Sequence, residues 1–409
     1  MRDYQPRQIV YPLKITSILP QKFSFCSEKK LVSKFSKILK GNYEIFLLGR
    51  ARIGIHLAAK YAIAESSSRD ILLSPFTIPE VVNMIITAGA NPVFVDSFEK
   101  SFDLDIGALE SEIQIRCPAA LIVTHYHFNQ KRLFEISVIC RKYGVLLIED
   151  SAIAMMQPDR DDEKIVRTCK IFSFSAFKAL NYFYGGLIAS EDDRFNDFVK
   201  REIMEYPRLT QSQYLGQALK TMIYALATNQ LIFSILTRRI YSRSARRRIP
   251  IAHRKPAPTV IGEIEVSCFS KPSAAAIIEL DSKVENLVVN CYHRRKISKV
   301  YFELLSELVV GSNANVSDIE LGSCFNFPIY LGDKRDSVYF DLLVAGYDVG
   351  RHMYDNCHSL PGMDTFCGSA ERIEKTRQGL LWLPTHPKIT AEYAKKLSEK
   401  LLSSLNNLS

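Results

Sequence analysis

The chain has 409 residues, of which 47% are hydrophobic and 24% are charged, and its formal net charge is +9. That composition excludes an intrinsically disordered or fibrous protein, and the length allows roughly two or three domains, each with its own core. Nine scattered cysteines without a C-x-x-C pair are typical of reduced, mostly buried thiols, and argue against a disulfide framework or a bound metal. The N-terminal sequence has no apolar signal-peptide core, so we expect a cytoplasmic protein.

Short apolar runs alternate with stretches of helical spacing from about residue 45 to residue 190. The predicted strands are Glu44–Leu48, Asp70–Ser74, Pro92–Asp96, Ala119–Thr124, Val145–Asp150 and Ile171–Ser175. The predicted helices are Ile53–Ala64, Pro79–Ala88, Ile106–Ile113 and Arg132–Lys142. Continuous apolar strands separated by helices indicate an α/β fold with a mostly parallel central sheet that is covered by helices on both faces.

Several of the predicted strands end in a polar side chain. These side chains are Ser74, Asp96, Thr124 and Asp150. Open α/β sheets bind their ligands at the carboxyl ends of the strands, so we expect the functional site at this edge of the sheet.

The composition changes after residue 207. Residues 215–236 carry one charge and are apolar nearly all round, and an arginine-rich tract follows them. The charge-free stretch Thr221–Thr237 is at the short limit of the roughly 17–25 residues that span a bilayer. This stretch therefore predicts a helix with an unusual apolar surface.

A linker with two prolines, residues 256–258, precedes a C-terminal region of mixed helix and strand. That region opens with a predicted helix over Ser273–Leu305 and ends with another over Ala391–Leu405. We predict three parts: an N-terminal segment (1–24), a large domain (25–255) with a helical insertion at about 207–255, and a small α+β domain (256–409).

Asp150 and Lys178 together indicate a chemical function. Asp150 closes an apolar strand, and Lys178 follows 28 residues later in a segment that also contains Ser173. A pyridoxal 5'-phosphate site requires a partly desolvated lysine that binds the cofactor covalently, and a carboxylate that pairs with the pyridine N–H. Ser173 and the helix start at Gly49, Arg50 and Ala51 are placed to hold the phosphate.

Longer motifs resemble one enzyme family. The run SPFTIPEVVNMIITAGANPVFVDSFEK, followed by LIVTHYHFN, LLIEDSAIA, FSFSAFK and YGGLIAS, resembles the DegT/DnrJ/EryC1/StrS family of aminotransferases in order and spacing. The similarity resumes at KPSAAAIIELDSKVENLVVNCYHRRK and at LLWLPTHPKIT. It implies the fold-type-I architecture of pyridoxal phosphate enzymes, with a smaller C-terminal α+β domain, and a homodimer.

The resemblance also implies roles for individual residues. Lys178 corresponds to the lysine that carries the cofactor and serves as the catalytic base, Asp150 to the partner of the pyridine nitrogen, and Ser173 to a phosphate ligand. Thr77 corresponds to the family's threonine beside the cofactor. His125 either lines the cofactor pocket or is a histidine satisfied by backbone groups.

Three positions depart from the family pattern. Ile153 stands where the family usually has a glutamine or histidine that contacts the phenolic oxygen of the cofactor. Ile78 stands where an aromatic residue often stacks on the pyridine ring, and Arg50 replaces the threonine of the usual G-T-x-A. With the lysine retained, these differences predict a working but divergent site.

The implied reaction is amination of a nucleotide-linked keto sugar, with glutamate as the amino donor, in polysaccharide or glycoconjugate biosynthesis. Two alternatives stay open. The chain could be a non-catalytic protein of the same fold with an interaction or regulatory role, or it could perform another reaction of the same cofactor, such as dehydration.

The charge of +9 is concentrated in one segment, because ten basic residues and no acidic residue lie between Pro207 and Gly262. Three interpretations fit: residues 215–255 contact anionic lipid at the inner membrane surface, the arginines capture a substrate pyrophosphate, or the helix packs on a partner subunit while the arginines are solvated. Nucleic-acid binding is disfavoured, because Tyr241 is the only aromatic residue interleaved in the tract.

Other residues have weaker signals. Arg351, with His352 and Tyr354 nearby, either receives a substrate carboxylate or is a surface arginine. We expect the pair Arg294 and Arg295 on a solvated helix face. Trp382, the only tryptophan, is expected in the core.

Overall fold

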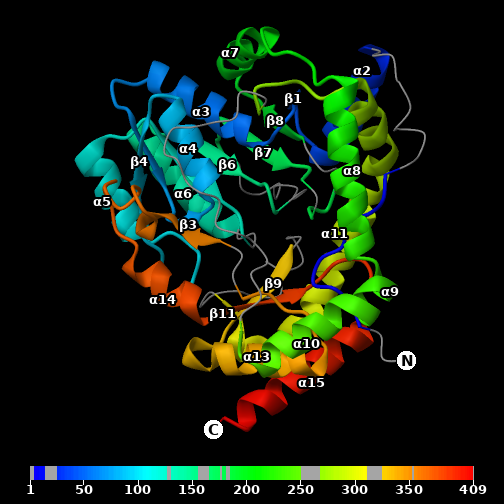
Figure 1. Ribbon diagram of the computed structural model, residues 1–409. Helices are drawn as coiled ribbons and strands as arrows, with labels where there is room; N and C mark the ends of the chain where they lie inside the picture. Colours follow the sequence, from blue (N-terminus) through cyan, green and yellow to red (C-terminus); the bar gives the residue numbers. More distant parts are fainter. Residues whose placement is uncertain are drawn as a thin grey trace.

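A seven-stranded sheet forms the centre of the larger part of the molecule (Figure 1). The computed structural model describes residues 4–13, 25–126, 130–154, 165–175, 177–180, 185–249, 268–310, 325–351 and 354–408. The strands of the sheet are β1 (Glu44–Leu48), β2 (Asp70–Leu73), β4 (Asn91–Phe94), β5 (Ala120–Thr124), β6 (Leu146–Asp150), β7 (Cys169–Ser173) and β8 (Gly186–Ser190).

The strand order is β1-β8-β7-β6-β5-β2-β4, and the five strands from β7 to β4 are parallel. Only β8 runs against its neighbours β7 and β1. The mostly parallel α/β sheet that the sequence predicts is therefore confirmed. The register pairs Thr124 of β5 with Asp150 of β6, so these two side chains lie on the same face of the sheet.

Helices cover both faces of this sheet. One face packs against α3 (Arg52–Ala64), α4 (Pro79–Thr87) and α7 (Asp193–Met204), and the opposite face against α5 (Ile106–Arg116) and α6 (Gln130–Tyr143). In β2, Ile71 and Leu73 belong to the first core and Leu72 to the second. Both faces of a central strand are thus covered, which is why the strands are continuous apolar runs rather than alternating ones.

The C-terminal part is built on a two-stranded antiparallel sheet of β9 (Asn326–Tyr330) and β11 (Leu380–Pro384). The end of α11 (Ala274–Leu305), together with α13 (Arg335–Ala345) and α15 (Ala391–Asn406), packs around this sheet. The start of α11 instead packs with α2 (Phe25–Leu39) against β1, β7 and β8. The long helix α11 therefore joins the two parts of the molecule (Figure 1).

Residues 4–13, at the N-terminal end of the chain, pack on the C-terminal part. The backbone N–H of Arg7 donates to Asp348 Oδ2 at 2.8 Å, and Nε2 of His386 is 2.6 Å from the carbonyl oxygen of Pro6. Both contacts are buried, so the two ends of the sequence stabilise one another.

Aromatic rings fill the interface between the two parts. Phe76, in the short strand β3 (Phe76–Thr77), stacks on Phe102 with ring centroids 5.4 Å apart. Phe102 in turn stacks on Trp382 of β11 at 5.5 Å, and Tyr354 packs edge-on against both Phe76 and Trp382. Trp382 is 1% exposed, which confirms its predicted place in the core.

The apolar stretch after residue 210 forms two helical segments rather than one helix. Helix α8 (Gln211–Ala227) ends at Thr228, and the side chain of Asn229 accepts a hydrogen bond from Leu231 N at 3.0 Å and so caps α9 (Gln230–Ile232). A π-helical turn (Phe233–Thr237) then leads into α10 (Arg238–Arg246). The predicted single helix was wrong here, because capping groups at residues 228 and 229 interrupt it.

No single helix among the described residues is long and apolar enough to cross a membrane. Two helical segments, Gln211–Ala227 and Gln230–Arg246, reach the required length and apolar composition only when they are taken together, and they are bent by 51° relative to each other. The predicted domain boundary at residue 255 stays a prediction. Helix α10, which precedes that boundary, packs with Tyr241 and Ala245 against the core of the C-terminal part.

Candidate active site

A cavity of about 160 Å³ lies at the carboxyl ends of β6 and β7, beside the start of α3. Five of the residues predicted for the site line it: Arg50, Ala51, Asp150, Ser173 and Lys178. The remaining lining residues are Arg52, Ile55, Ile78, Val81, Ala152, Ile171, Ser175 and Gly185. The structure thus brings together groups that are as much as 128 positions apart in the sequence, from Arg50 to Lys178.

Asp150 ends β6 and is 5% exposed. Its Oδ1 accepts a hydrogen bond from the backbone N–H of Ala152 at 3.0 Å, and the hydroxyl of Thr124 also bonds to the carboxyl group. Burial raises the pKa of Asp150 above its usual value, although the Ala152 N–H, the Lys178 ammonium and the Thr124 hydroxyl oppose this shift. A cationic N–H that enters the cavity would therefore stabilise the ionised form of this buried carboxyl group.

Lys178 lies in the loop after β7 and is half-buried. Its backbone N–H donates to the carbonyl of Ser175 at 3.0 Å, which closes a tight turn. The Nζ atom lies 5.0 Å from the centroid of the Phe325 ring, at the start of the C-terminal part. The amine of Lys178 is therefore held between the sheet edge and an aromatic wall that comes from the other part of the molecule.

Some groups that line the cavity favour an anion. They are Arg50 and Arg52 at the first turn of α3, and the hydroxyl-bearing residues Ser173 and Ser175. The positive end of a helix dipole, guanidinium groups and hydroxyls together form a phosphate site. Gly186 permits this arrangement, because a Cβ at this position would overlap the backbone of Ala51.

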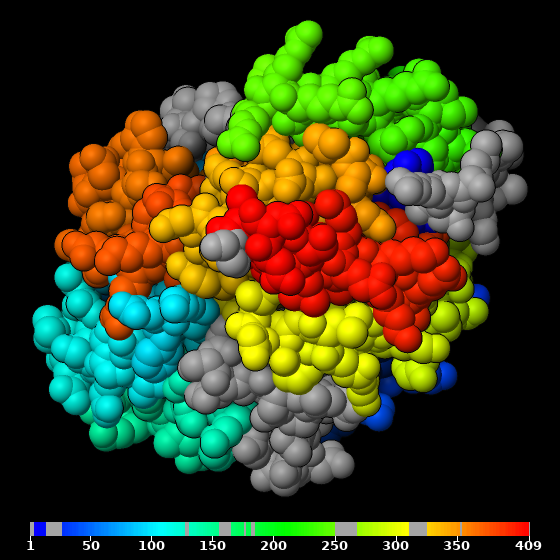
Figure 2. All heavy atoms as spheres, turned by 90° about the horizontal axis from the view of Figure 1, so that it is seen from below, coloured from blue at the N-terminus to red at the C-terminus, as the bar shows by residue number. Residues whose placement is uncertain are grey.

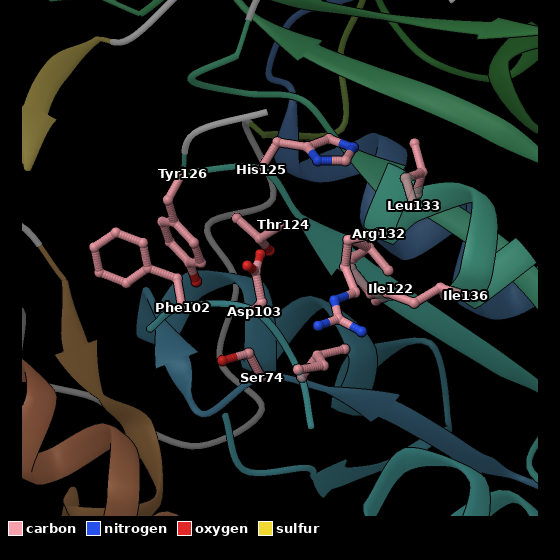
Figure 3. Close-up of a pocket in the computed structure, with 12 residues that line it drawn as sticks. Ser74, Phe102, Asp103, Ile122, Thr124, His125, Tyr126, Arg132, Leu133 and Ile136 are labelled. Carbon is pink, nitrogen blue, oxygen red and sulfur yellow. The ribbon is translucent and has the colours of Figure 1, made fainter. Parts of the chain in front are cut away.

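Three predicted cofactor residues do not line the cavity. Gly49 packs on Ser270, to whose carbonyl oxygen its backbone N–H donates at 2.7 Å. Thr77 is buried in β3, and its neighbour Ile78 lines the cavity instead. His125 follows Thr124 and faces the other side of the sheet, where it lines a separate hollow of about 30 Å³ beside α6 (Figure 3).

His125 belongs to a buried group of charges around Glu149. Its Nε2 donates to Glu149 Oε2 at 3.0 Å, and the guanidinium of Arg167 pairs with the other carboxylate oxygen. Burial alone would raise the pKa of Glu149, but Arg167, Lys170 and His125 outweigh burial and hold that pKa well below its usual value. The alternative that His125 is satisfied by neighbouring groups is therefore favoured, but its main partner is a carboxylate rather than the backbone.

We expect Glu149→Gln to lower the free energy of unfolding by about 3–5 kcal/mol, because it leaves the guanidinium of Arg167 buried without its counter-charge. Since the pKa of Glu149 is lowered in the folded state, its stabilising effect is present above the unfolded-state pKa of about 4.3 and is lost as the pH falls through the folded-state pKa. Urea unfolding at neutral and acidic pH measures both effects.

The control for this prediction is Glu110→Gln, because the ion pair of Glu110 with Lys142 lies at the surface. This variant should retain the stability of the parent protein. If Glu149→Gln unfolds at the same urea concentration as the control, the buried charge group does not stabilise the sheet edge.

Several expectations outside the cavity are corrected or refined. Arg294 is 4% exposed and bonds to Asn290 Oδ1, to Thr385 Oγ1 and to the carbonyl of Phe325 at 2.7 Å, so the prediction of a solvated face was wrong for this residue. Arg351 is partly buried and pairs with Asp336 at 2.7 Å.

Ile153 lies in the aromatic cluster rather than among the residues that line the cavity. Two residues beside Lys178 were not among the predicted site residues: Ser175 and Phe325. Ser175 has a visible signal, since it follows Ser173 on the same loop, whereas nothing in the local sequence connects Phe325 to the lysine.

The residues of the cavity fit pyridoxal 5'-phosphate. Asp150 suits the pyridine nitrogen, the amine of Lys178 suits the aldehyde carbon, and Arg50 with Ser173 suits the phosphate. Aliphatic side chains of Ile55, Ile78 and Val81 line the cavity between these groups, where they can pack on an aromatic ring. The donor set therefore matches each functional group of the cofactor.

The sheet order and this cavity define a pyridoxal phosphate enzyme of fold type I. Residues 38–218 match the model of the DegT/DnrJ/EryC1/StrS aminotransferase family, which confirms the resemblance seen in the sequence. The match covers residues 38–218 only, and the members of that family are pyridoxal phosphate-dependent aminotransferases.

Solved structures show the same fold over the whole chain. The aminotransferase TlmJ from Streptoalloteichus hindustanus is 17% identical, with a TM-score of 0.68 and 100% of both chains covered. Helicobacter pylori PseC, an aminotransferase involved in the biosynthesis of pseudoaminic acid, is 13% identical, with a TM-score of 0.69 and 99% of both chains covered. DesI, solved in the presence of its TDP-sugar product, is 15% identical, with a TM-score of 0.65, 100% of this chain and 94% of DesI covered.

Proposed function

We propose that this aminotransferase transfers an amino group from glutamate to a keto sugar that is linked to a nucleotide, in polysaccharide or glycoconjugate biosynthesis. The observation that carries the proposal is the cavity that Lys178 and Asp150 line together with the anion-favouring groups Arg50 and Ser173. Similar structures support the substrate class, since PseC is involved in the biosynthesis of pseudoaminic acid and DesI was solved in the presence of its TDP-sugar product. A homodimer in the cytoplasm is part of the same proposal.

Each residue of the cavity has a separate task in this reaction. Arg50, Ser173 and the first turn of α3 bind the phosphate and so fix the position of the ring. The Asp150 carboxylate holds the proton of the pyridine nitrogen, and the Nζ of Lys178 moves a proton to and from the carbon that bears the amine. The bound cofactor supplies the electron sink that makes that carbon acidic.

Retention of the lysine favours transamination over dehydration. Within fold-type-I sugar enzymes, the dehydratase branch lacks the lysine, whereas Lys178 is present here and lies next to Asp150 in the same cavity. The geometry therefore supports transfer of an amino group rather than loss of water.

The test uses the purified holoenzyme in two separate half-reactions. We expect glutamate alone to abolish the visible absorbance of the cofactor and to release 2-oxoglutarate, and a keto sugar nucleotide to restore the absorbance. A panel of such nucleotides and the corresponding free keto sugars identifies the acceptor. If glutamate fails while other amino acids react, the donor is wrong, and if only free sugars or keto acids restore the band, the proposal of a nucleotide-linked acceptor fails.

A further inference from the structure

The helices α8, α9 and α10 present a large apolar surface to solvent. Half of the exposed large apolar side chains among the described residues lie between Leu215 and Ile249, which is a small fraction of the chain. Figure 2 shows the green segment that contains these helices along one edge of the molecule, with its side chains projecting outward. An exposed apolar patch of this kind marks a surface that binds something.

The exposed aliphatic and methionine side chains of α8 form a stripe along the helix. Its members are Leu215, Leu219, Met222, Ile223 and Leu226, at the spacing i, i+4, i+7, i+8 and i+11. Leu219 is 62% exposed, whereas Tyr214, Ala218 and Thr221 on the opposite face are almost fully buried in the protein. This helix thus has two apolar faces, of which only one is covered.

The stripe continues beyond the bend. Leu231 of α9 is 68% exposed, and Ile235, Leu236 and Ile240 are exposed as well. Exposed arginines follow directly: Arg239 and Arg243 lie one turn apart on the outer face of α10, and Arg246, Arg247 and Arg248 follow them. The helices therefore carry an apolar surface that ends in a group of cations.

The charge of this surface discriminates between its candidate occupants. A two-fold contact between copies of this chain through this surface would bring the same patch of both subunits together, so the arginines of one subunit would face the arginine-rich patch of the other. No acidic residue between Pro207 and Gly262 would neutralise them. An anionic lipid surface instead supplies both an apolar interior and negative headgroups.

We propose that α8, α9 and α10 bind the enzyme to an anionic lipid surface, with the apolar stripe in the headgroup and acyl boundary and the arginines at the headgroups. The segment lies in the interface and does not cross the bilayer, because Tyr214, Ala218 and Thr221 pack the inner face of α8 onto the protein. This binding is independent of the substrate, so its failure would leave the proposed reaction untouched.

The test is flotation of the full-length holoenzyme with vesicles of phosphatidylcholine alone and with vesicles that also contain phosphatidylglycerol. We expect the protein to float only with the second kind, and the floating fraction to fall as salt rises. Each arginine near the surface contributes about a fivefold change in partitioning. The variant Arg239→Gln/Arg243→Gln should therefore bind roughly twenty-five-fold more weakly.

Leu219→Ser/Ile223→Ser should abolish flotation, and both of these side chains are exposed, so the fold does not depend on them. Two matched controls carry the same kinds of change elsewhere on the surface. Arg141→Gln/Lys131→Gln removes two exposed charges of α6, and Ile115→Ser/Met204→Ser removes two exposed apolar side chains of α5 and α7. Both controls should float like the parent protein.

Three outcomes would overturn the proposal. The protein could fail to float with either vesicle, or it could float equally well with both. The third outcome concerns sedimentation without lipid. If the parent protein is an oligomer and Leu219→Ser/Ile223→Ser is a monomer, the stripe is an interface between copies of this chain.

Discussion

Lys178→Ala should lower kcat for transamination by about three orders of magnitude or more, because the variant loses the group that moves the proton at the amine-bearing carbon. The same variant should lose the visible absorbance of the lysine-bound cofactor. Borohydride reduction of the parent holoenzyme should attach the cofactor to the peptide that contains Lys178, as mass spectrometry would show. Lys178 is half-buried in a loop, so the fold should persist.

Lys178→Arg separates the charge of the lysine from its chemistry. The variant keeps a cation near Asp150 and beside the Phe325 ring. A guanidinium, however, does not bind the cofactor covalently and does not release its proton at neutral pH. We expect this variant to be as inactive as Lys178→Ala, whereas Lys131→Ala on the surface should be fully active. Transamination by purified Lys178→Ala at a rate close to that of the parent protein would refute the assignment of the catalytic lysine.

Asp150→Asn should lower kcat by about a hundredfold to a thousandfold, because a neutral amide cannot hold a proton on the pyridine nitrogen in the way a buried carboxylate does. The substitution keeps the shape of the side chain and its hydrogen bond with Ala152, so the effect should appear in kcat more than in stability. Asp341→Asn on the exposed face of α13 is the control.

The pH dependence of cofactor binding tests the same residue. Burial raises the pKa of Asp150, so its carboxyl group takes up a proton at a higher pH than an exposed aspartate does. Cofactor affinity should therefore fall as the pH falls through this raised pKa, and Asp150→Asn should lack that dependence. Absorbance titrations across the acidic range measure it, and parallel curves for both proteins would argue against a pairing of Asp150 with the cofactor.

Much of the site follows from local sequence. An apolar run that ends in Asp150, and a loop lysine after the next strand, locate both groups at the carboxyl edge of the sheet. The register between strands does not follow, because it depends on how β5 and β6 pair. That register places Thr124 beside Asp150 and sends His125 to the opposite face with Glu149. A shift of the β5–β6 register by one residue would have placed His125, rather than Thr124, beside Asp150.

The contacts between the two parts of the molecule could not be predicted from the sequence either. Helix α11 packs on the large sheet at its start and on β9 and α15 later, so no single face of it is solvated along its whole length. Periodicity in such a helix does not reveal which face meets which neighbour, and Arg294 was accordingly assigned to solvent. The approach of Phe325 to Lys178 depends on the same packing.

The ring stack between the two parts gives the enzyme an intrinsic optical reporter. Trp382 is the only tryptophan of the chain, and it lies between Phe102 of the large part and Tyr354 of the C-terminal part. All ultraviolet emission from indole therefore originates at the seam that a hinge motion would open. A change in that emission on substrate binding would therefore indicate that the packing at this seam has changed, without an added label.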